Sequence, residues 1–531
     1  MDPEIAIALS GGGYRAAMFH LGTLMYLHRL KNDKGKSFLE MVNTISTISG
    51  GTITGLWYML QYVNDKVTDE SFKELYDKLK DSVVIEEGLN NLLGSSRDSF
   101  IKEMVAIYDE VFFNHACFDV ILDKIDNGHI HHFSANGTDF SNGLAFRFQA
   151  SRKIINTNPK FNRGIIGNNE HGIPWEVAKK IKLSEILAVS SCFPGGFEPM
   201  FFPSDFQLGK DESLLSSIEM FKEDIPLMDG GIVDNQGIEP ILLANKQMLY
   251  DDQRAAGNKN FPCHDLIIVS DVTSPRADSI KAFNFVWLKD LSMKSIDCML
   301  TIGAVLFASV SIFTYCYGYD RTFGAVLCLS IQLVLLRLLS LAVNVFCLCL
   351  LKRAPVRVSI NNIRSYPLCN LVTIMGNRLN SLLHLSKAIF MKPIRQMRYN
   401  ALYENERWNN RRITNTIYEL TSDFGSWKNK LSQNGCIPEW LAPSEEIQKT
   451  SKKATEMGTT LWFTDKDKED GVPEALLACG QYNICMNLLE YIEKLKKNSE
   501  NTTEAHEVIK GFEEQLRVDW EKFKRNPMWM V

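Results

Sequence analysis

The chain has 531 residues, of which 45% are hydrophobic and 23% are charged, and its formal net charge is -5. A chain of this length is long for one domain, so we expect a main domain with an appended part. The small net charge, without a basic stripe interleaved with aromatic residues, argues against a nucleic-acid partner. The twelve cysteines include no Cys-x-x-Cys pair, which argues against a zinc site or a disulfide framework and favours a reducing compartment.

The first 62 residues contain two predicted strand–turn–helix units. Residues 4–10 (EIAIALS) predict a strand that runs into three glycines, and an apolar helix follows to about Leu30. Residues 41–48 predict a second strand that ends at Ser49, and another apolar helix continues to about Tyr62. Such units indicate a mostly parallel sheet covered by helices. A cleavable leader would have to consume the first strand, so we expect this part of the chain to face the cytoplasm.

The pattern continues to about residue 275. Residues 69–126 are amphipathic and predict a helical cap or side layer. Further strands are predicted at 144–149 and 265–271. Residues 1–275 are therefore expected to form one α/β domain.

A long apolar block follows. Residues 298–318 carry no charge, and residues 322–351 are interrupted only by Arg337. At ~1.5 Å per residue these helices would span about 30 and about 45 Å, against a hydrocarbon thickness of ~30 Å. We expect a transmembrane helical hairpin over 298–351, with both ends on the cytoplasmic side because basic residues flank both ends.

Two other interpretations of this block stay open. The helices could be buried in a large soluble domain, or they could form a re-entrant or in-plane hairpin. Arg337 favours the second alternative, because an arginine within lipid needs a partner or a route to the interface.

Residues 355–531 are polar, charged and mostly helical in pattern. The basic stretch 387–398 fits an anionic membrane surface. The Lys/Glu-rich stretch 490–510 predicts a solvated helix face. We expect a separate C-terminal helical region.

Three motifs carry chemistry. The glycines in Ser10-Gly11-Gly12-Gly13-Tyr14-Arg15 leave backbone N–H groups free beside the positive end of a helix, which suits a phosphate or an oxyanion; the alternative is a tight turn. Thr47-Ile48-Ser49-Gly50-Gly51 fits a strained nucleophile elbow, although Thr47 stands where the usual pattern has glycine; the alternative is a helix N-cap. Asp229-Gly230-Gly231 would present a carboxylate at a cleft rim, or would form a simple turn.

In this order, the three motifs resemble the patatin-like phospholipase family. Shorter matches support the resemblance over residues 4–275, namely Thr138-Asp139 with Gly143, residues 146–148 and residues 190–197. The resemblance implies an α/β fold of three layers, α/β/α, with the helical hairpin inserted or appended and a C-terminal helical region beside it.

The resemblance also implies the site. Ser49 would be the nucleophile and Asp229 its base, without histidine, metal or cofactor. The implied oxyanion hole consists of Gly11, Gly12, Gly13 and Gly50. Arg15 would support substrate charge, and Asp234 and Asn235 would fix the loop after the base. His20 is expected to pack or cap, and the cluster His129, His131 and His132 is expected to lie in a polar loop without a metal.

The expected activity is hydrolysis of fatty-acyl esters in membrane lipids, with phospholipids or lysophospholipids as substrates. Neutral glycerides are the alternative substrate for the same chemistry. A non-catalytic lipid-binding scaffold is the alternative from another class, although nucleophile, base and glycine loop are all present.

Overall fold

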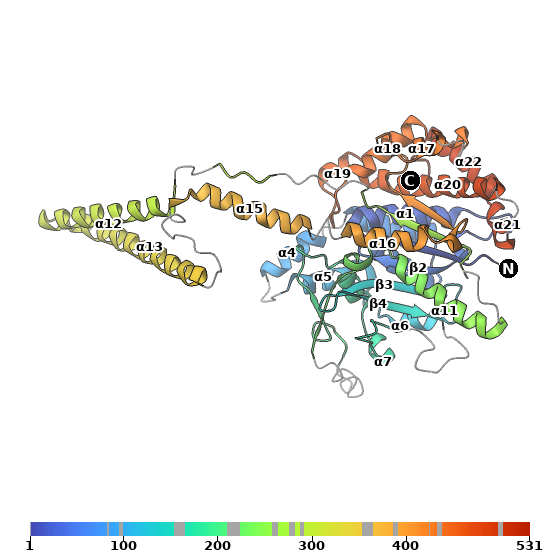
Figure 1. Ribbon diagram of the computed structural model, residues 1–531, viewed down its shortest axis with the longest axis horizontal. Helices are drawn as coiled ribbons and strands as arrows, with labels where there is room; N and C mark the ends of the chain where they lie inside the picture. The colour runs from blue at the N-terminus through green and yellow to red at the C-terminus, as the bar shows by residue number, and fades with distance from the viewer. Residues whose placement is uncertain are drawn as a thin grey trace. The chain divides into compact units, whose positions relative to one another are not determined.

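A computed structural model describes residues 2–81, 84–94, 99–152, 165–209, 223–256, 264–274, 282–286, 291–352, 365–385, 391–423, 425–432, 438–497 and 503–531 (Figure 1). The chain forms two compact units. One contains residues 1–277 together with 387–531, and the other contains residues 278–386. The division thus differs from the predicted one, because the C-terminal region folds with the N-terminal domain and the second unit is an insertion.

The first unit is built on an eight-stranded mixed sheet in the order β5-β6-β3-β2-β1-β7-β8, with β4 paired to β3. Its parallel part consists of β1 (Ile5–Leu9), β2 (Val42–Ile48), β3 (His132–Asp139), β7 (Leu266–Asp271) and β8 (Arg412–Thr416). The antiparallel pairings involve β4 (Leu144–Ser151), β5 (Met200–Phe202) and β6 (Ile225–Asp229). The central strands β1 and β2 are buried along their whole length, as expected of parallel strands covered on both faces.

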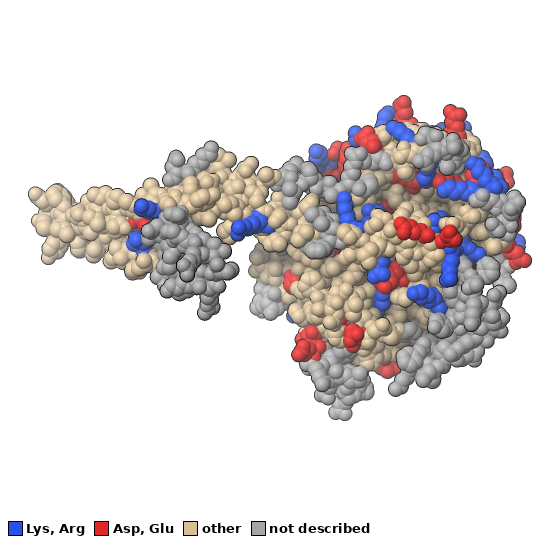
Figure 2. Space-filling model, in the orientation of Figure 1, with Lys and Arg blue, Asp and Glu red and all other residues tan. Residues whose placement is uncertain are grey.

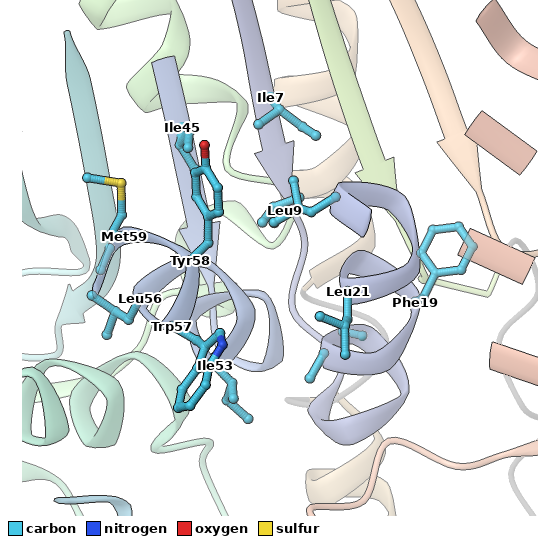
Figure 3. Packing of buried hydrophobic residues seen from close by; sticks show 14 of the residues in the cluster. Ile7, Leu9, Phe19, Leu21, Ile45, Ile53, Leu56, Trp57, Tyr58 and Met59 are labelled. Atoms are coloured by element: carbon cyan, nitrogen blue, oxygen red, sulfur yellow. The ribbon is translucent and has the colours of Figure 1, made fainter. Parts of the chain in front are cut away.

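One face of the sheet is covered by α1 (Gly13–Arg29), α2 (Gly50–Val63) and α8 (Leu183–Ser191). Side chains of β1, β2, α1 and α2 interlock in this layer, as Figure 3 shows for Leu9, Ile45, Leu21 and Ile53. The helix α1 is buried on all sides from Gly13 to Leu27 because α20 (Val472–Lys497) packs along its outer side. A helix that is covered all round needs no polar face.

The opposite face is covered by α11 (Ile238–Ala256) and α16 (Met391–Tyr403). Small and branched side chains of β1 and β7 pack there against Ile238, Ile241 and Leu402. Helices therefore lie on both faces of the sheet, which confirms the predicted three-layer α/β/α fold.

The remaining helices mostly surround this core. Residues 69–126 are largely helical, as predicted, with α3 (Asp69–Asp81), α4 (Val84–Gly94), α5 (Phe100–Tyr108), a π-helical turn (Asp109–Phe113) and α6 (Asp119–Lys124). Shorter or outer helices are α7 (Trp175–Ala178), α10 (Gly231–Asp234), α17 (Trp427–Ser432), α18 (Glu445–Glu456), α19 (Asp465–Glu469), α21 (Glu504–Lys510) and α22 (Glu513–Arg525). In the C-terminal region, α18 and α22 both pack on α20.

The inserted unit contains the two apolar helices α12 (Met293–Cys316) and α13 (Asp320–Lys352), followed by α15 (Leu368–His384). The segments Lys294–Cys316 and Phe323–Ala342 are long and apolar enough to cross a membrane. Their side chains are mostly exposed within the chain, and Figure 2 shows the pair almost free of charged residues. Burial in a soluble core therefore does not account for them.

The two apolar helices form an antiparallel hairpin with polar contacts between them. The Arg337 guanidinium lies 3.0 Å from the Asp297 carboxylate, and the Ser340 hydroxyl donates to the same carboxylate at 2.5 Å. The Ser330 hydroxyl donates to the carbonyl of Ala304 at 3.2 Å. Arg337 thus has the partner that an arginine in an apolar helix requires.

Several strands were absent from the sequence-based prediction, namely β3, β5, β6 and β8. The prediction that His129, His131 and His132 lie in a polar loop is wrong for His132, which is a buried residue of β3. Within the described ranges, no group of three or more His, Cys, Asp or Glu side chains is arranged to hold a metal ion.

The contact between α1 and α20 makes a testable prediction. A Cβ atom on Gly480 would overlap the carbonyl oxygen of Phe19 on α1. We expect Gly480→Ala to lower the free energy of unfolding by about 1–3 kcal/mol, because the two backbones would have to separate. Thermal unfolding measures this change. Gly458→Ala is the matched control, since the nearest atom to its Cβ would lie 3.9 Å away; equal effects of the two substitutions would contradict the prediction.

Candidate active site

Ser49 occupies a sharp turn between β2 and α2. Its backbone angles, φ 50° and ψ -119°, lie in a region that side chains other than glycine rarely adopt and that costs about 1–3 kcal/mol. The side chain is nearly buried, with 8% of the residue exposed. A nucleophile elbow requires strained geometry of this kind, and Ser49 has it.

A polar contact from α8 holds the strained turn. The Ser49 amide donates to the Ser190 hydroxyl at 2.9 Å, and that hydroxyl donates to the carbonyl of Asn136 on β3 at 2.8 Å. The Thr52 hydroxyl lies 2.8 Å from the same oxygen. Ser190 lies in the stretch that matched the family pattern, but the sequence assigned it no role.

The departure from the usual elbow pattern at Thr47 has a structural explanation. The methyl group of Thr47 fits because Gly55 of α2 has no side chain. A Cβ atom on Gly55 would overlap that methyl group. The Thr47 hydroxyl donates to the carbonyl of Ser134 at 3.3 Å. The elbow therefore closes tightly although residue 47 is not glycine.

Asp229 ends β6 opposite Gly137 of β3. Its amide donates to the carbonyl of Cys192 at 2.9 Å, and its carbonyl accepts from the Thr138 hydroxyl at 2.8 Å. The residue is thus fixed on both sides of its backbone. Its carboxyl group lines the same cavity as Ser49, and the Ser49 hydroxyl lowers its pKa, so the structure brings the two predicted catalytic side chains together.

The Asp229 carboxyl group is buried, with 6% of the residue exposed. Burial raises its pKa from 3.8 to about 7, although hydrogen bonds from the Gly231 amide and the Ser49 hydroxyl act in the opposite direction. The Gly231 amide donates at 2.7 Å. A carboxylate with a pKa near 7 is well matched to accept a proton at neutral pH.

The glycine loop after β1 lies against the elbow, backbone to backbone. A Cβ on Gly50 would overlap the carbonyl oxygen of Gly13, and Gly13 has φ +60°. Among the described residues, no acceptor is found for the amides of Gly12, Gly13 and Gly50. The Gly11 amide, in contrast, donates to the carbonyl of Asn235 at 3.0 Å. The Gly11 amide therefore already has an acceptor, and Gly11 is removed from the predicted set of oxyanion donors.

Arg15 lines the cavity that contains Ser49 and Asp229. Its guanidinium donates to the carbonyls of Met457 at 2.9 Å and Val272 at 3.1 Å, and only 7% of the residue is exposed. By donating to these two carbonyls, the Arg15 guanidinium joins three segments around the glycine loop. These contacts fix the position of the Arg15 side chain, and its support of substrate charge stays a prediction.

A cavity of about 250 Å³ opens beside Ser49 and Asp229. Its apolar lining comes from Phe193, Pro194, Ile232 and Leu461. Leu461 belongs to the C-terminal region, as does Thr460, whose carbonyl accepts from the Tyr14 amide at 2.8 Å. The sequence did not place this region at the site, because nothing in its local pattern indicates a contact with residues more than 400 positions away.

The polar residues near the site have the structural roles expected of them. Asp234 accepts from the amides of Gln236, Gly237 and Glu239, and so fixes the loop after Asp229. His20 is fully buried between the Ser10 carbonyl and the Ser270 hydroxyl, both at 3.0 Å. Burial lowers the pKa of His20 to about 4, so its ring is neutral at physiological pH.

The buried carboxyl group predicts a pH-dependent stability change. Because folding raises the pKa of Asp229 from 3.8 to about 7, its contribution to stability is complete below the lower value and is lost as pH rises through the higher one. We expect Asp229→Asn to raise the free energy of unfolding by about 1–3 kcal/mol at about pH 8. Thermal unfolding across pH should show the gain growing from about pH 4 and levelling off above about pH 7; a gain independent of pH would contradict this.

Residues 7–242 match the family model of patatin-like phospholipase. No curated protein matches the chain. A structure of human GIVD cytosolic phospholipase A2 is 12% identical, with a TM-score of 0.29, over 51% of this chain and 43% of that one. Its complex with methyl gamma-linolenyl fluorophosphonate and terbium chloride is 16% identical, with a TM-score of 0.23, over 43% and 34%.

The present chain thus spans less than half the length of these two structures. The family match covers the glycine loop, the Ser49 elbow and Asp229, which are the residues that surround the cavity. Residues 7–242 are therefore similar to the patatin-like phospholipase family.

Proposed function

We propose that the protein is a membrane-associated serine acyl hydrolase that cleaves fatty-acyl esters of phospholipids or lysophospholipids. The observation that carries this proposal is that Ser49, held on a strained turn, and the buried Asp229 carboxyl group line the same cavity. The family match supports lipid acyl hydrolysis in general. The nucleophile, its base and the class of substrate are our assignments.

In the first half of the reaction, the ionised Asp229 carboxylate takes the proton of the Ser49 hydroxyl. The Ser49 oxygen forms a bond to the ester carbonyl carbon, and the carbonyl electrons move to its oxygen. When this intermediate collapses, the bond to the alcohol oxygen breaks and Asp229 returns the proton to the leaving alcohol. The product is an acyl-Ser49 ester.

The negative charge on the carbonyl oxygen needs donors that are already in place. The amides of Gly12, Gly13 and Gly50 have no acceptor within the described part of the chain, and Gly13 and Gly50 begin α1 and α2. The first amides of a helix point outward beside the positive end of its dipole. We assign these three amides to the oxyanion hole.

In the second half, a water molecule replaces the alcohol. Asp229 takes a proton from water, the hydroxide oxygen bonds to the acyl carbon, and the Ser49 oxygen leaves with the proton from Asp229. Fatty acid is released and the enzyme is restored. His20 has no part in this sequence, because its ring nitrogens contact Ser10 and Ser270.

Two features support a membrane lipid as substrate. The cavity beside Ser49 has apolar walls from Phe193, Pro194, Ile232 and Leu461, which suit an acyl chain. The helices α12 and α13 are exposed, apolar and long enough to enter a bilayer, and would keep the enzyme among its substrates. We place the catalytic unit on the cytoplasmic side, because basic residues flank the hairpin.

The assignment of the nucleophile can be tested with a fluorophosphonate probe. Purified protein should be labelled at Ser49, and Ser49→Ala should lose both labelling and release of fatty acid from phosphatidylcholine and lysophosphatidylcholine vesicles. Equal labelling of the variant would overturn the assignment. Release from a triglyceride emulsion, without release from the vesicles, would instead indicate a neutral glyceride lipase. An unlabelled and inactive wild-type protein would indicate a scaffold.

The base assignment makes a prediction about pH. Asp229 must be ionised to accept a proton, and its pKa is about 7, so kcat/KM should rise with pH through about 7 and then level off. Asp229→Asn should abolish turnover. His20→Gln should keep the shape of this profile, because the neutral His20 ring takes no proton in the reaction; loss of the rise near pH 7 in that variant would point to a triad.

Ser190 should matter through the position of Ser49. We expect Ser190→Ala to lower kcat by about tenfold to hundredfold with little change in KM, because the Ser49 amide loses its acceptor and the elbow relaxes. Steady-state kinetics on a soluble ester measures both constants. Ser184→Ala, the same change on the same helix at a residue whose hydroxyl has no partner among the described residues, is the control. Equal losses in the two variants would rule out a specific role for Ser190.

A further inference from the structure

A buried ion pair joins the last strand before the insertion to the first helix after it. Asp271 ends β7, shortly before the insertion begins at residue 278, and Arg395 lies on α16, shortly after the insertion ends at residue 386. The Arg395 guanidinium lies 2.7 Å from the Asp271 carboxylate. The Asp271 side chain is only 1% exposed and the Arg395 side chain 24% exposed. The segment before the insertion and the segment after it are thus joined by an ion pair inside the first unit.

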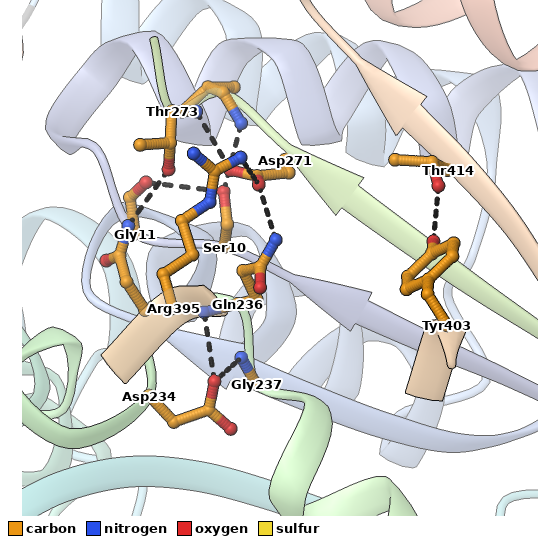
Figure 4. Close-up of polar contacts among 12 residues, drawn as sticks. Ser10, Gly11, Asp234, Gln236, Gly237, Asp271, Thr273, Arg395, Tyr403 and Thr414 are labelled. Carbon is orange, nitrogen blue, oxygen red and sulfur yellow. Dashed lines mark hydrogen bonds and ion pairs between the residues drawn. The ribbon is translucent and has the colours of Figure 1, made fainter. Parts of the chain in front are cut away.

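The Asp271 carboxylate has two further partners (Figure 4). It accepts from the Thr273 amide at 2.8 Å and from the Gln236 side-chain amide at 2.8 Å. Although burial raises the pKa of Asp271, the Arg395 charge and these hydrogen bonds outweigh burial and hold the pKa below its usual value. The carboxylate is therefore a charged junction between three segments.

One arm of this junction leads to the glycine loop. The Thr273 hydroxyl accepts from the Asn235 side-chain amide at 3.1 Å, and the Asn235 carbonyl accepts from the Gly11 amide at 3.0 Å. The Val272 amide also donates to the Ser10 hydroxyl at 3.1 Å. The backbone next to Asp271 thus holds the loop that carries the free amides of Gly12 and Gly13.

The other arm leads to the loop after Asp229. Gln236 follows Asp234, which accepts the Gln236 amide at 3.2 Å. The helix α16 packs on α10, which begins two residues after Asp229. The glycine loop and the loop after Asp229 therefore both connect to the buried Asp271 carboxylate, each through two or three hydrogen bonds.

We propose that the Arg395–Asp271 ion pair, which we call the clasp, ties the strand before the insertion to the helix after it. Through this tie, the clasp positions the glycine loop against Ser49. Arg395 is then a positioning residue, supplied by the segment that follows the apolar helices. The proposal rests on the proposed function for its kinetic readout. It also replaces the predicted membrane-surface role for this basic stretch at Arg395 and at Arg398, which pairs with Glu239 at 2.9 Å.

Removing one member of a buried pair leaves the other without compensation. In Arg395→Gln, the Asp271 carboxylate would lose its cation, and the bonds that it accepts from Thr273 and Gln236 would weaken or shift. A displacement of the glycine loop by about 1 Å is enough to reduce catalysis strongly. The apolar wall of the cavity comes from Phe193, Pro194, Ile232 and Leu461, which lie outside this hydrogen-bonded network, so the loss should fall on the chemical step.

The test compares full-length Arg395→Gln, Asp271→Asn, the double variant and Arg395→Lys with wild type. The readouts are the rate constant for fluorophosphonate labelling of Ser49, kcat and KM on a soluble ester, and the thermal unfolding temperature. We expect each single neutral variant to lose at least about tenfold in labelling rate and kcat with little change in KM. The double variant should lose no more than the worse single variant, since both remove one interaction. Arg395→Lys, which keeps the charge, should recover most of the rate.

Arg411→Gln is the matched control. Arg411 lies 3.5 Å from Asp265, which precedes the opposite end of β7. It should lower the unfolding temperature about as much as Arg395→Gln while keeping the labelling rate within about twofold of wild type. Equal labelling rates in wild type and Arg395→Gln, or equal losses in Arg395→Gln and Arg411→Gln, would overturn the clasp.

Failure of the proposed function is distinguishable from failure of the clasp. If wild-type protein is neither labelled nor active, the proposed function fails. Backbone hydrogen exchange then tests the clasp without any measurement of activity. The clasp predicts faster exchange in the peptide that contains residues 8–15 in Arg395→Gln and Asp271→Asn than in Arg395→Lys and Arg411→Gln. Unchanged exchange in that peptide would overturn it.

Discussion

The site depends on the close approach of two backbones. The loop after β1 and the elbow after β2 touch at Gly13 and Gly50, where any Cβ on Gly50 would overlap the Gly13 carbonyl oxygen. Adjacent parallel strands bring their carboxyl ends to one edge of the sheet, but only residues without side chains permit this approach. Two helix N-termini and the strained Ser49 then face one small volume, and Asp229 reaches it from the antiparallel strand β6.

The covering of α1 links the C-terminal region to this volume. Because α20 packs along the outer side of α1, the first helix is enclosed and the segment before α20 reaches the glycine loop. There the Thr460 and Met457 carbonyls accept from the Tyr14 amide and the Arg15 guanidinium. The C-terminal helices are thus part of the unit that holds the candidate active site, although their composition suggested a separate charged region.

Two arginines in or after the apolar block form ion pairs inside the protein. Arg337 pairs with Asp297 within the hairpin, and Arg395 pairs with Asp271 within the first unit. The same holds for Glu490, predicted on a solvated face, which is buried and lies 2.6 Å from Lys430. A charge run in sequence does not reveal whether its partner lies in solvent, at a membrane or in a distant segment.

Much of the site follows from local sequence. Gly12, Gly13, Ser49 and Asp229 lie in short motifs whose turn chemistry is local, and the long amphipathic and apolar segments predict their helices well. The tertiary structure decided the rest. The strands β6 and β8 are short and acquire their partners only in the sheet. Ser190 acquires its role from Ser49, 141 residues away. Gly11 is excluded as a donor by the Asn235 carbonyl, and the pKa of Asp229 is set by burial. These properties depend on long-range packing, which no local pattern encodes.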